Sequence, residues 1–342
     1  MLNSLKDVDG FKTDGNRFLS ASHEEIRSGA TTDIYFVNTR DVLASIGRLD
    51  VPVAAEVFAR KGGLFAGIGE VCELLSGLPL EVEALPEGTR FEPKETLLRV
   101  RGSYGDFGVF ETALLGFLSS SSGWATAARE CVDAAGGRPV LSFGARHVHP
   151  SVASVMDAVA VKAGGCAGAS TILGARLAGK DPSGTVPHTA VLLTGDTAAL
   201  ARAYDAALPG HIGRIFLVDT FKDEAEESLR LAEALGKRLE AVRLDTPGER
   251  GGVTADLVRE VRWRLDMASF KHVKIVATGG LTPPRIAELA AAGADVFGVG
   301  SYIAHAAPID MTMDIKEIEG RPVAKRGRLP GVLVNSRLVR IQ

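Results

Sequence analysis

Short apolar strands alternate with amphipathic helices between about residues 110 and 305, and this pattern limits the possible folds more than any other feature. Helical patterns with apolar residues three and four apart separate the strands, as in residues 222–236 and 254–269. Strands that alternate with helices of this length predict parallel β/α units. The expected strands lie at 138–144, 167–173, 189–195, 214–220, 239–245, 272–280 and 294–301. About seven strands favour an irregular parallel β/α barrel, although a doubly wound sheet stays possible.

The two ends of the chain have a different pattern. Residues 1–110 carry Pro and Gly turns between short alternating strands, which predicts an N-terminal α/β lobe that is rich in β-structure. Residues 306–342 are again turn-rich and strand-like, and we expect this tail to pack back on the N-terminal lobe. The expected organisation is therefore a lobe (1–110, with 306–342) and a barrel domain (111–305).

Composition excludes several classes of function. The chain has 342 residues, is 46% hydrophobic and carries a net charge of −3, so a basic surface for nucleic acid is not expected. The first residues are polar and charged, unlike a signal peptide, and no apolar run reaches the roughly 18 residues of a membrane span. Three scattered cysteines without CxxC spacing predict a cytoplasmic protein with no disulfide framework and no structural zinc.

Polar or glycine-rich segments follow most of the expected strands. Because catalytic groups of β/α barrels gather at the carboxyl ends of the strands, these segments indicate one shared site. Each alone would serve equally well as an ordinary helix cap. Two successive glycine-rich strand ends would make a phosphate cradle from main-chain N–H groups. The candidates are Arg146, Asp219, Arg243, Asp245, the phosphate-binding residues Gly279 and Gly280, and their counterparts Gly300 and Ser301.

Residue chemistry suggests roles for several of these candidates. Arg146 and Arg243 are bidentate donors suited to a carboxylate or a phosphate. Asp219 and Asp245 would bind ribose hydroxyls, hold Mg²⁺ or offset developing positive charge.

Two further candidates come from elsewhere in the chain. In the turn-prone segment 183–188, Thr185 supplies a hydroxyl and His188 a group that exchanges protons or phosphate near neutral pH. Tyr35 would stack on a flat heterocycle, or else be an ordinary core or interface tyrosine.

Seven motifs in order resemble the nicotinate phosphoribosyltransferase family, and the resemblance covers about residues 25–330. The motifs are TTDIYF (31–36), FGARHVHP (143–150), SGTVPH (183–188), LVDTF (217–221), VRLD (242–245), ATGGL (277–281) and FGVGSYI (297–303). The resemblance implies the type II phosphoribosyltransferase fold and a homodimer or larger assembly with shared sites. It implies transfer from 5-phosphoribosyl-1-diphosphate (PRPP) to nicotinate with Mg²⁺, coupled to ATP.

The resemblance also implies roles for individual residues. His188 is similar to the phosphorylated histidine, and Asp219 and Asp245 match positions that handle ribose or Mg²⁺. The resemblance assigns nicotinate binding to Tyr35, Arg146, Thr185 and Arg243. It assigns binding of the 5′-phosphate to a loop that contains Gly279, Gly280, Gly300 and Ser301.

Three other functions remain open on the sequence alone. Quinolinate phosphoribosyltransferase, whose substrate has a second carboxylate and loses it as CO₂, is the first. Nicotinamide as the acceptor is the second, although an amide does not need two arginines. The third is a nucleotide-binding protein without catalytic activity on the same fold.

Overall fold

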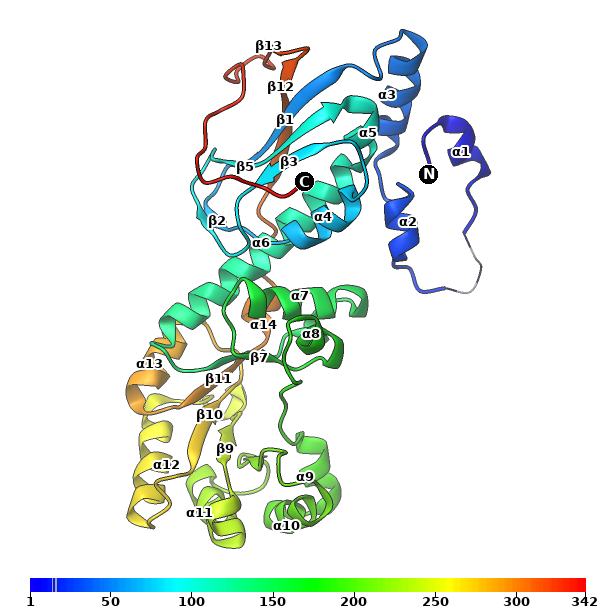
Figure 1. The fold of residues 1–342 in the computed structure, drawn as a ribbon. Helices are drawn as coiled ribbons and strands as arrows, with labels where there is room; N and C mark the ends of the chain where they lie inside the picture. Colours follow the sequence, from blue (N-terminus) through cyan, green and yellow to red (C-terminus); the bar gives the residue numbers. More distant parts are fainter. Residues whose placement is uncertain (14, 16) are drawn as a thin grey trace. The chain divides into compact units, whose positions relative to one another are not determined.

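The computed structural model describes residues 1–13, 15 and 17–342, which form two compact units (Figure 1). The N-terminal unit comprises Met1–Thr126 and Ala307–Gln342, and the C-terminal unit comprises Ala127–Ala306. The boundary between them falls inside the long helix α6 (Glu111–Ala134). Each unit contains its own six-stranded sheet.

The sheet of the N-terminal unit joins strands from both ends of the chain. Its order is β13-β12-β1-β5-β3-β14, with β1 antiparallel to both β5 and β12. The strands of this unit are β1 (Pro52–Ala59), β2 (Gly63–Leu64), β3 (Glu81–Ala84), β4 (Arg90–Phe91), β5 (Thr96–Ser103), β12 (Met311–Ile318), β13 (Arg321–Pro322) and β14 (Val339–Arg340). Its helices before α6 are α1 (Leu5–Gly10), α2 (His23–Arg27), α3 (Ile34–Ser45), α4 (Ile68–Leu75), α5 (Tyr104–Phe107) and the 3-10 turn η1 (Gly108–Phe110).

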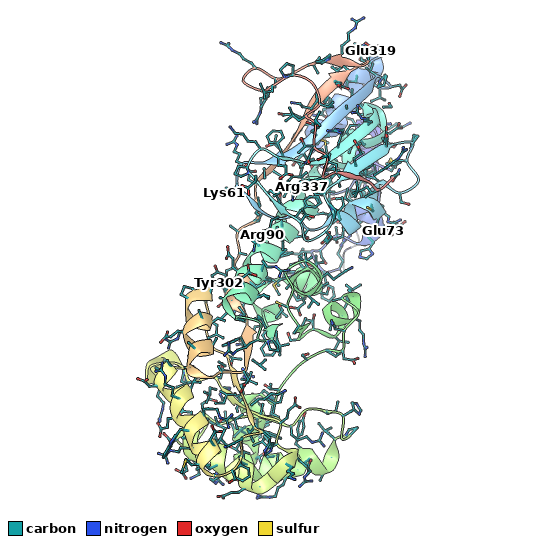
Figure 2. All side chains as sticks on the ribbon, turned by 60° about the vertical axis from the view of Figure 1, so that its left-hand side comes forward. Lys61, Glu73, Arg90, Tyr302, Glu319 and Arg337 are labelled. Carbon is teal, nitrogen blue, oxygen red and sulfur yellow. The ribbon has the colours of Figure 1, made fainter. Side chains whose placement is uncertain are left out.

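A buried ionic network fastens the C-terminal tail to this sheet. Arg99 on β5 lies opposite Glu56 on β1 and Glu83 on β3. It donates hydrogen bonds to Glu56 (2.9 Å) and to Glu83 (2.8 Å). The guanidinium also donates to the carbonyl of Leu333, whose N–H donates to Glu56 (3.1 Å). Farther along the tail, Arg337 pairs with Glu95 (2.9 Å) (Figure 2). The tail therefore depends on charges supplied by the strands beneath it.

The C-terminal unit contains a parallel sheet in the order β7-β6-β11-β10-β9-β8. These strands are β6 (Val140–Ser142), β7 (Gly168–Ala169), β8 (Ile215–Leu217), β9 (Ala241–Leu244), β10 (Lys274–Ala277) and β11 (Val296–Val299). Most of their residues are buried, as expected for a parallel sheet. The α/β class, with an N-terminal lobe and a parallel β/α domain, is confirmed, and the parallel sheet is curled into part of a barrel.

Helices follow the strands of the C-terminal unit, and α10 to α13 each pack against the next along the sheet (Figure 1). These helices are α7 (Pro150–Lys162), α8 (Ile172–Leu177), α9 (His188–Thr194), α10 (Thr197–Ala207), α11 (Glu224–Leu235), α12 (Ala255–Met267), α13 (Pro283–Ala292) and α14 (Ser301–Ala304). The 3-10 turns are η2 (Ala145–His147), η3 (Gly236–Arg238) and η4 (Gly248–Arg250).

The strand expected at 189–195 is wrong, because these residues form helix α9. Pro187 precedes the first helical residue, and Gly195 ends the helix in the left-handed conformation (φ 80°), which are strong helix boundaries. Only Val191 of the apolar run is buried, so the run has no sheet to join. The parallel sheet consequently has β7 and β8 as its two edges, with α9 in the segment between them.

Within the described part of the chain, no helix combines the length and the apolar character needed to cross a bilayer.

Removal of the buried arginine should loosen the tail. We expect Arg99→Ala to lower the free energy of unfolding by about 3 to 5 kcal/mol, because Glu56 would keep a buried charge without its partner. The measurement is urea denaturation followed by circular dichroism. Arg27→Ala breaks the exposed pair with Glu73 and is the matched control, with an expected loss below about 1 kcal/mol. Equal stability of the two variants would contradict the proposed fastening.

Candidate active site

Three neighbouring strands of the parallel sheet end in polar residues. Asp219 follows β8 after one intervening residue, Asp245 directly follows β9, and Thr278 directly follows β10. Because parallel strands place their carboxyl ends along one edge, these side chains come close together although they are distant in sequence. Ligands of open parallel sheets bind at this edge.

Arg243 is the centre of a hydrogen-bonded cluster. Its guanidinium donates to the Thr185 hydroxyl (2.6 Å), to the Thr278 hydroxyl (3.0 Å) and to the Asp245 carboxylate (2.8 Å). These bonds use three of the five N–H donors of an arginine. The planar guanidinium is therefore held in a fixed orientation with two donors left over.

Thr278 was not among the predicted site residues, and the structure makes it part of the cluster. Its hydroxyl lies 2.7 Å from Asp245 Oδ1 and 3.1 Å from the Leu244 carbonyl, while it accepts from Arg243. The neighbouring glycines allow this packing. A Cβ on Gly298 would lie 2.6 Å from the Thr278 methyl, and one on Gly279 (φ 91°) would lie 3.2 Å from Asp245. The sequence signal was a hydroxyl directly after the apolar run 274–277.

His188 and Asp219 form a second pair. His188 Nε2 lies 3.0 Å from Asp219 Oδ2, and the two side chains are 39% and 1% exposed. The other carboxylate oxygen of Asp219 is buried and has no hydrogen-bond partner among the described residues, and the same holds for the Thr220 hydroxyl. Because buried polar atoms are normally satisfied, these two atoms mark a place where a ligand or water binds.

The protonation of Asp219 reflects its burial. Desolvation raises the pKa of Asp219 above its ordinary value, the hydrogen bond from His188 lowers it, and the charge of Asp245 raises it. Burial has the largest effect. His188 thus supports the ionised form of a carboxylate that its surroundings would otherwise neutralise.

The remaining predicted residues lie in different places. Arg146 is exposed in η2 after β6, and in the described part of the chain it forms no hydrogen bond with the Arg243 cluster. Gly279 and Gly280 follow β10 with positive φ angles, Gly300 lies between β11 and α14, and Ser301 is the first residue of α14. Tyr35 lies on α3 of the N-terminal unit and is 56% exposed. Its stacking role stays a prediction.

The acidic pair is suited to Mg²⁺. Asp219 and Asp245 follow adjacent strands, and Asp219 has a buried oxygen without a partner among the described residues. Mg²⁺ is usually held by one or two carboxylates together with substrate oxygens. Within the described ranges no three His, Cys, Asp or Glu residues form a metal site of their own, so the substrate would have to complete the coordination.

Comparison with known proteins places the chain among the phosphoribosyltransferases. Residues 33–122 match the family model "Quinolinate phosphoribosyl transferase, N-terminal domain", and residues 124–314 match the C-terminal domain. The chain belongs to the quinolinate phosphoribosyltransferase family, one of the type II phosphoribosyltransferases.

The chain is also similar to individual known proteins. A structure of nicotinate-nucleotide pyrophosphorylase from Pyrococcus furiosus is 44% identical with a TM-score of 0.88, and covers 93% of this chain and 82% of that one. Nicotinate phosphoribosyltransferase pncB1 from Mycobacterium tuberculosis is 29% identical, over 87% of this chain and 75% of its own. A nicotinate-nucleotide pyrophosphorylase from Francisella tularensis shares the fold (TM-score 0.60, 16% identity, 88% of this chain and all of that one).

These findings correct the expected activity. The expectation of an ATP-coupled nicotinate phosphoribosyltransferase with a phosphohistidine at His188 is wrong, because both family models and the Pyrococcus structure point to the quinolinate enzymes, which do not use ATP. The seven motifs indicated a type II phosphoribosyltransferase correctly, and the nicotinate activity and ATP coupling inferred from them are wrong.

Loss of His188 should change the titration of Asp219. In His188→Ala the hydrogen bond and the charge interaction with His188, which both lower the pKa of Asp219, disappear, so this pKa should rise further. The carboxylate would then become protonated at a higher pH than in the wild type. The measurement is a ¹³C NMR titration of labelled aspartate, with the exposed His272→Ala as the control. An unchanged or lower pKa would show that His188 does not support the Asp219 charge.

Thr278→Val tests the hydrogen-bonded cluster with almost no change in volume. We expect kcat/KM for phosphoribosyl transfer to fall by about tenfold to a hundredfold, because Arg243 and Asp245 lose a shared partner. Thr312→Val on β12 is the matched control and should leave kcat/KM unchanged. Full activity of Thr278→Val at unchanged thermal stability would exclude a role for the cluster.

Proposed function

We propose that the protein transfers the phosphoribosyl group of PRPP to quinolinate without ATP. The ring nitrogen of quinolinate attacks C1 of the ribose, the bond from C1 to pyrophosphate breaks, and the C2 carboxylate leaves as CO₂. The electron pair left at C2 takes up a proton. The products are nicotinate mononucleotide, pyrophosphate and CO₂, one of each per turnover.

The observation that carries this proposal is the pair of matches to the two quinolinate phosphoribosyltransferase domains, which together extend from residue 33 to residue 314. The 44% identity to the Pyrococcus pyrophosphorylase supports it over nearly the whole chain. A pyrophosphorylase is named for the same bond, between C1 of the ribose and pyrophosphate.

Catalysis in this proposal is mainly electrostatic. Departure of pyrophosphate leaves positive charge on the ribose ring, and fixed carboxylates near C1 would stabilise that charge. Asp219 and Asp245 are the carboxylates at the sheet edge, and Asp219 has an oxygen available for a ribose hydroxyl or for Mg²⁺. Mg²⁺, when bound with the substrate, would offset the charge of the departing pyrophosphate.

The acceptor would bind through its carboxylates. Arg243 has two N–H donors that point to no partner in the cluster, and Thr185 fixes its orientation. Arg146 is a second arginine, exposed in the turn η2 that follows β6 of the same sheet. We assign both arginines to the two carboxylates of quinolinate, and we assign Tyr35 to stacking on the pyridine ring.

The 5′-phosphate would bind at the glycine-rich strand ends. Gly279 and Gly280 adopt left-handed conformations, and Gly279 packs close to Asp245. Gly300 and Ser301 supply further main-chain N–H groups at the end of β11. Because Tyr35 belongs to the N-terminal unit, we also propose a homodimer or larger assembly with a shared site, as the motif resemblance implies.

A direct assay separates quinolinate from the alternative acceptor. Purified protein with quinolinate, PRPP and Mg²⁺ should release CO₂, pyrophosphate and nicotinate mononucleotide in equal amounts, and ATP should not change the rate. The parallel reaction contains nicotinate in place of quinolinate, with and without ATP. Preference for nicotinate, or stimulation by ATP, would overturn the proposal. Asp245→Asn measures any contaminating host enzyme, because the variant should lose most of the activity.

A further inference from the structure

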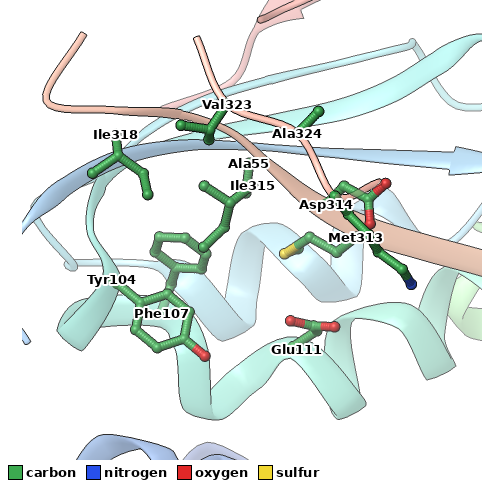
Figure 3. Close-up of a pocket in the computed structure, with 11 residues that line it drawn as sticks. Ala55, Tyr104, Phe107, Glu111, Met313, Asp314, Ile315, Ile318, Val323 and Ala324 are labelled. Atoms are coloured by element: carbon green, nitrogen blue, oxygen red, sulfur yellow. The ribbon is translucent and has the colours of Figure 1, made fainter. Parts of the chain in front are cut away.

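A cavity of about 410 Å³ lies within the N-terminal unit (Figure 3). Its lining comes from β1, α5, the first residue of α6, β12 and residues 323–325. This volume falls in the range of small-molecule sites, roughly 300 to 1,000 Å³. Every lining residue belongs to the N-terminal unit, and none is among the residues of the candidate active site.

Most of the cavity wall is apolar and aromatic. Tyr104 and Phe107 pack edge to face with their ring centroids 5.8 Å apart, and the Met313 thioether projects between these rings and Glu111 (Figure 3). Ile315 and Ile318 of β12 complete the wall. Aromatic faces and a polarisable sulfur attract both a hydrophobic ring and a positive charge.

Two carboxylates line the same cavity, and only one of them is neutralised. Asp314 forms an ion pair with Arg328 (3.1 Å). Glu111 is half-buried, and in the described parts of the chain its carboxylate has no hydrogen bond and no ion pair. Figure 3 shows the Glu111 carboxylate directed into the space beside Met313. A half-buried acid without a partner, between aromatic rings, is suited to a cation that carries apolar surface.

The other charged and titratable groups around Glu111 are few. Tyr104 comes from α5, Asp314 from β12 and Tyr35 from α3, and none of them supplies a positive charge. Arg328 is engaged by Asp314, and Lys325 is exposed at the lining segment 323–325. Burial, with a smaller contribution from Asp314, raises the pKa of Glu111 to about 7.

We propose that this cavity binds a small organic cation that carries one hydrophobic ring, with its ammonium or ring-nitrogen charge on Glu111 and its ring against Tyr104, Phe107 and Met313. Neither the family match nor the proposed transfer reaction assigns a ligand to these residues. The site is therefore a second binding site on the chain, and its occupation does not depend on the acceptor used in catalysis.

The affinity of such a site should depend on pH in a defined direction. A cation favours ionised Glu111, and with a pKa of about 7 that form makes up about 9% of the free protein at pH 6 and about 91% at pH 8. Binding should thus be about tenfold tighter at pH 8 than at pH 6. Asp314 is paired with Arg328, whereas Glu111 has no ion pair among the described residues, so we attribute the expected change to Glu111.

The test uses three probes of similar size on the full chain. Phenethylamine is the cation, 2-phenylethanol its neutral analogue and 3-phenylpropionate its anionic analogue, each titrated by isothermal calorimetry at pH 6 and pH 8. We expect phenethylamine alone to bind, tenfold more tightly at pH 8, with proton release at pH 6. Equal binding of all three probes, preference for the anion or no binding of phenethylamine would overturn the proposal.

Two variants locate the binding in the cavity. Glu111→Gln should abolish phenethylamine binding, while Glu73→Gln, an exposed acid of the same unit, should leave it unchanged (Figure 2). Glu111→Gln should also fold. Folding raises the pKa of Glu111, so ionisation of this carboxyl at pH 8 lowers the stability of the wild type, and the neutral glutamine does not have this cost. Ala324→Phe fills the cavity from an exposed position and should block binding as well. Undiminished binding in both cavity variants would place the ligand elsewhere.

The outcome is separable from the proposed reaction. Calorimetry measures occupation of the N-terminal unit whether or not quinolinate is turned over. A protein that binds phenethylamine through Glu111 but does not use quinolinate would retain this inference and lose the proposed function. A protein that uses quinolinate but does not bind phenethylamine would retain the proposed function and lose this inference.

Discussion

The arrangement of the candidate active site depends on the bonding of one arginine. Arg243 projects from the middle of β9 and is tied to Thr185, Thr278 and Asp245, which belong to three different segments of the C-terminal unit. Without these bonds a long guanidinium side chain would sample many rotamers. The hydrogen bonds convert it into a fixed pair of donors at the sheet edge, and they hold Asp245 in place beside Gly279. Orientation of substrate groups by fixed donors is the main requirement of a reaction in which binding and charge stabilisation do most of the work.

The architecture of the C-terminal unit could be predicted from the sequence because its strands are buried on both faces. Short apolar runs such as 275–277 and 296–299 are typical of buried parallel strands, and Thr278 and Gly300 directly follow these two runs. The run at 189–195 has a similar composition and forms a helix. The helix is bounded by Pro187 and Gly195, and the segment has no neighbouring strand with which to pair. The lack of a neighbouring strand depends on the tertiary structure and cannot be read from hydrophobic periodicity.

The site was predictable to a similar degree. Asp219, Arg243, Asp245, Thr185 and His188 were singled out from strand ends and one turn, and the structure joins them into two hydrogen-bonded groups. The part played by Thr278 was missed because a hydroxyl after a strand is also an ordinary helix cap. The ATP-coupled nicotinate activity was wrong although the motifs include residues assigned to the acceptor, such as Tyr35 and Arg243. The number of carboxylates on the acceptor depends on side-chain positions that short motifs do not specify.

The helix in place of a seventh strand has a consequence for how such a protein changes over time. Residues 181–187 have no regular secondary structure, and α9 makes no ladder hydrogen bonds to β7 or β8. The histidine that faces Asp219 is consequently carried on helix α9, outside the sheet, and not on one of the six strands. Substitution of this helix between relatives would alter the chemistry next to the acidic pair while all six strands keep their pairing. Descendants of one ancestral scaffold could acquire or discard a reactive imidazole step by step, with no refolding of the sheet.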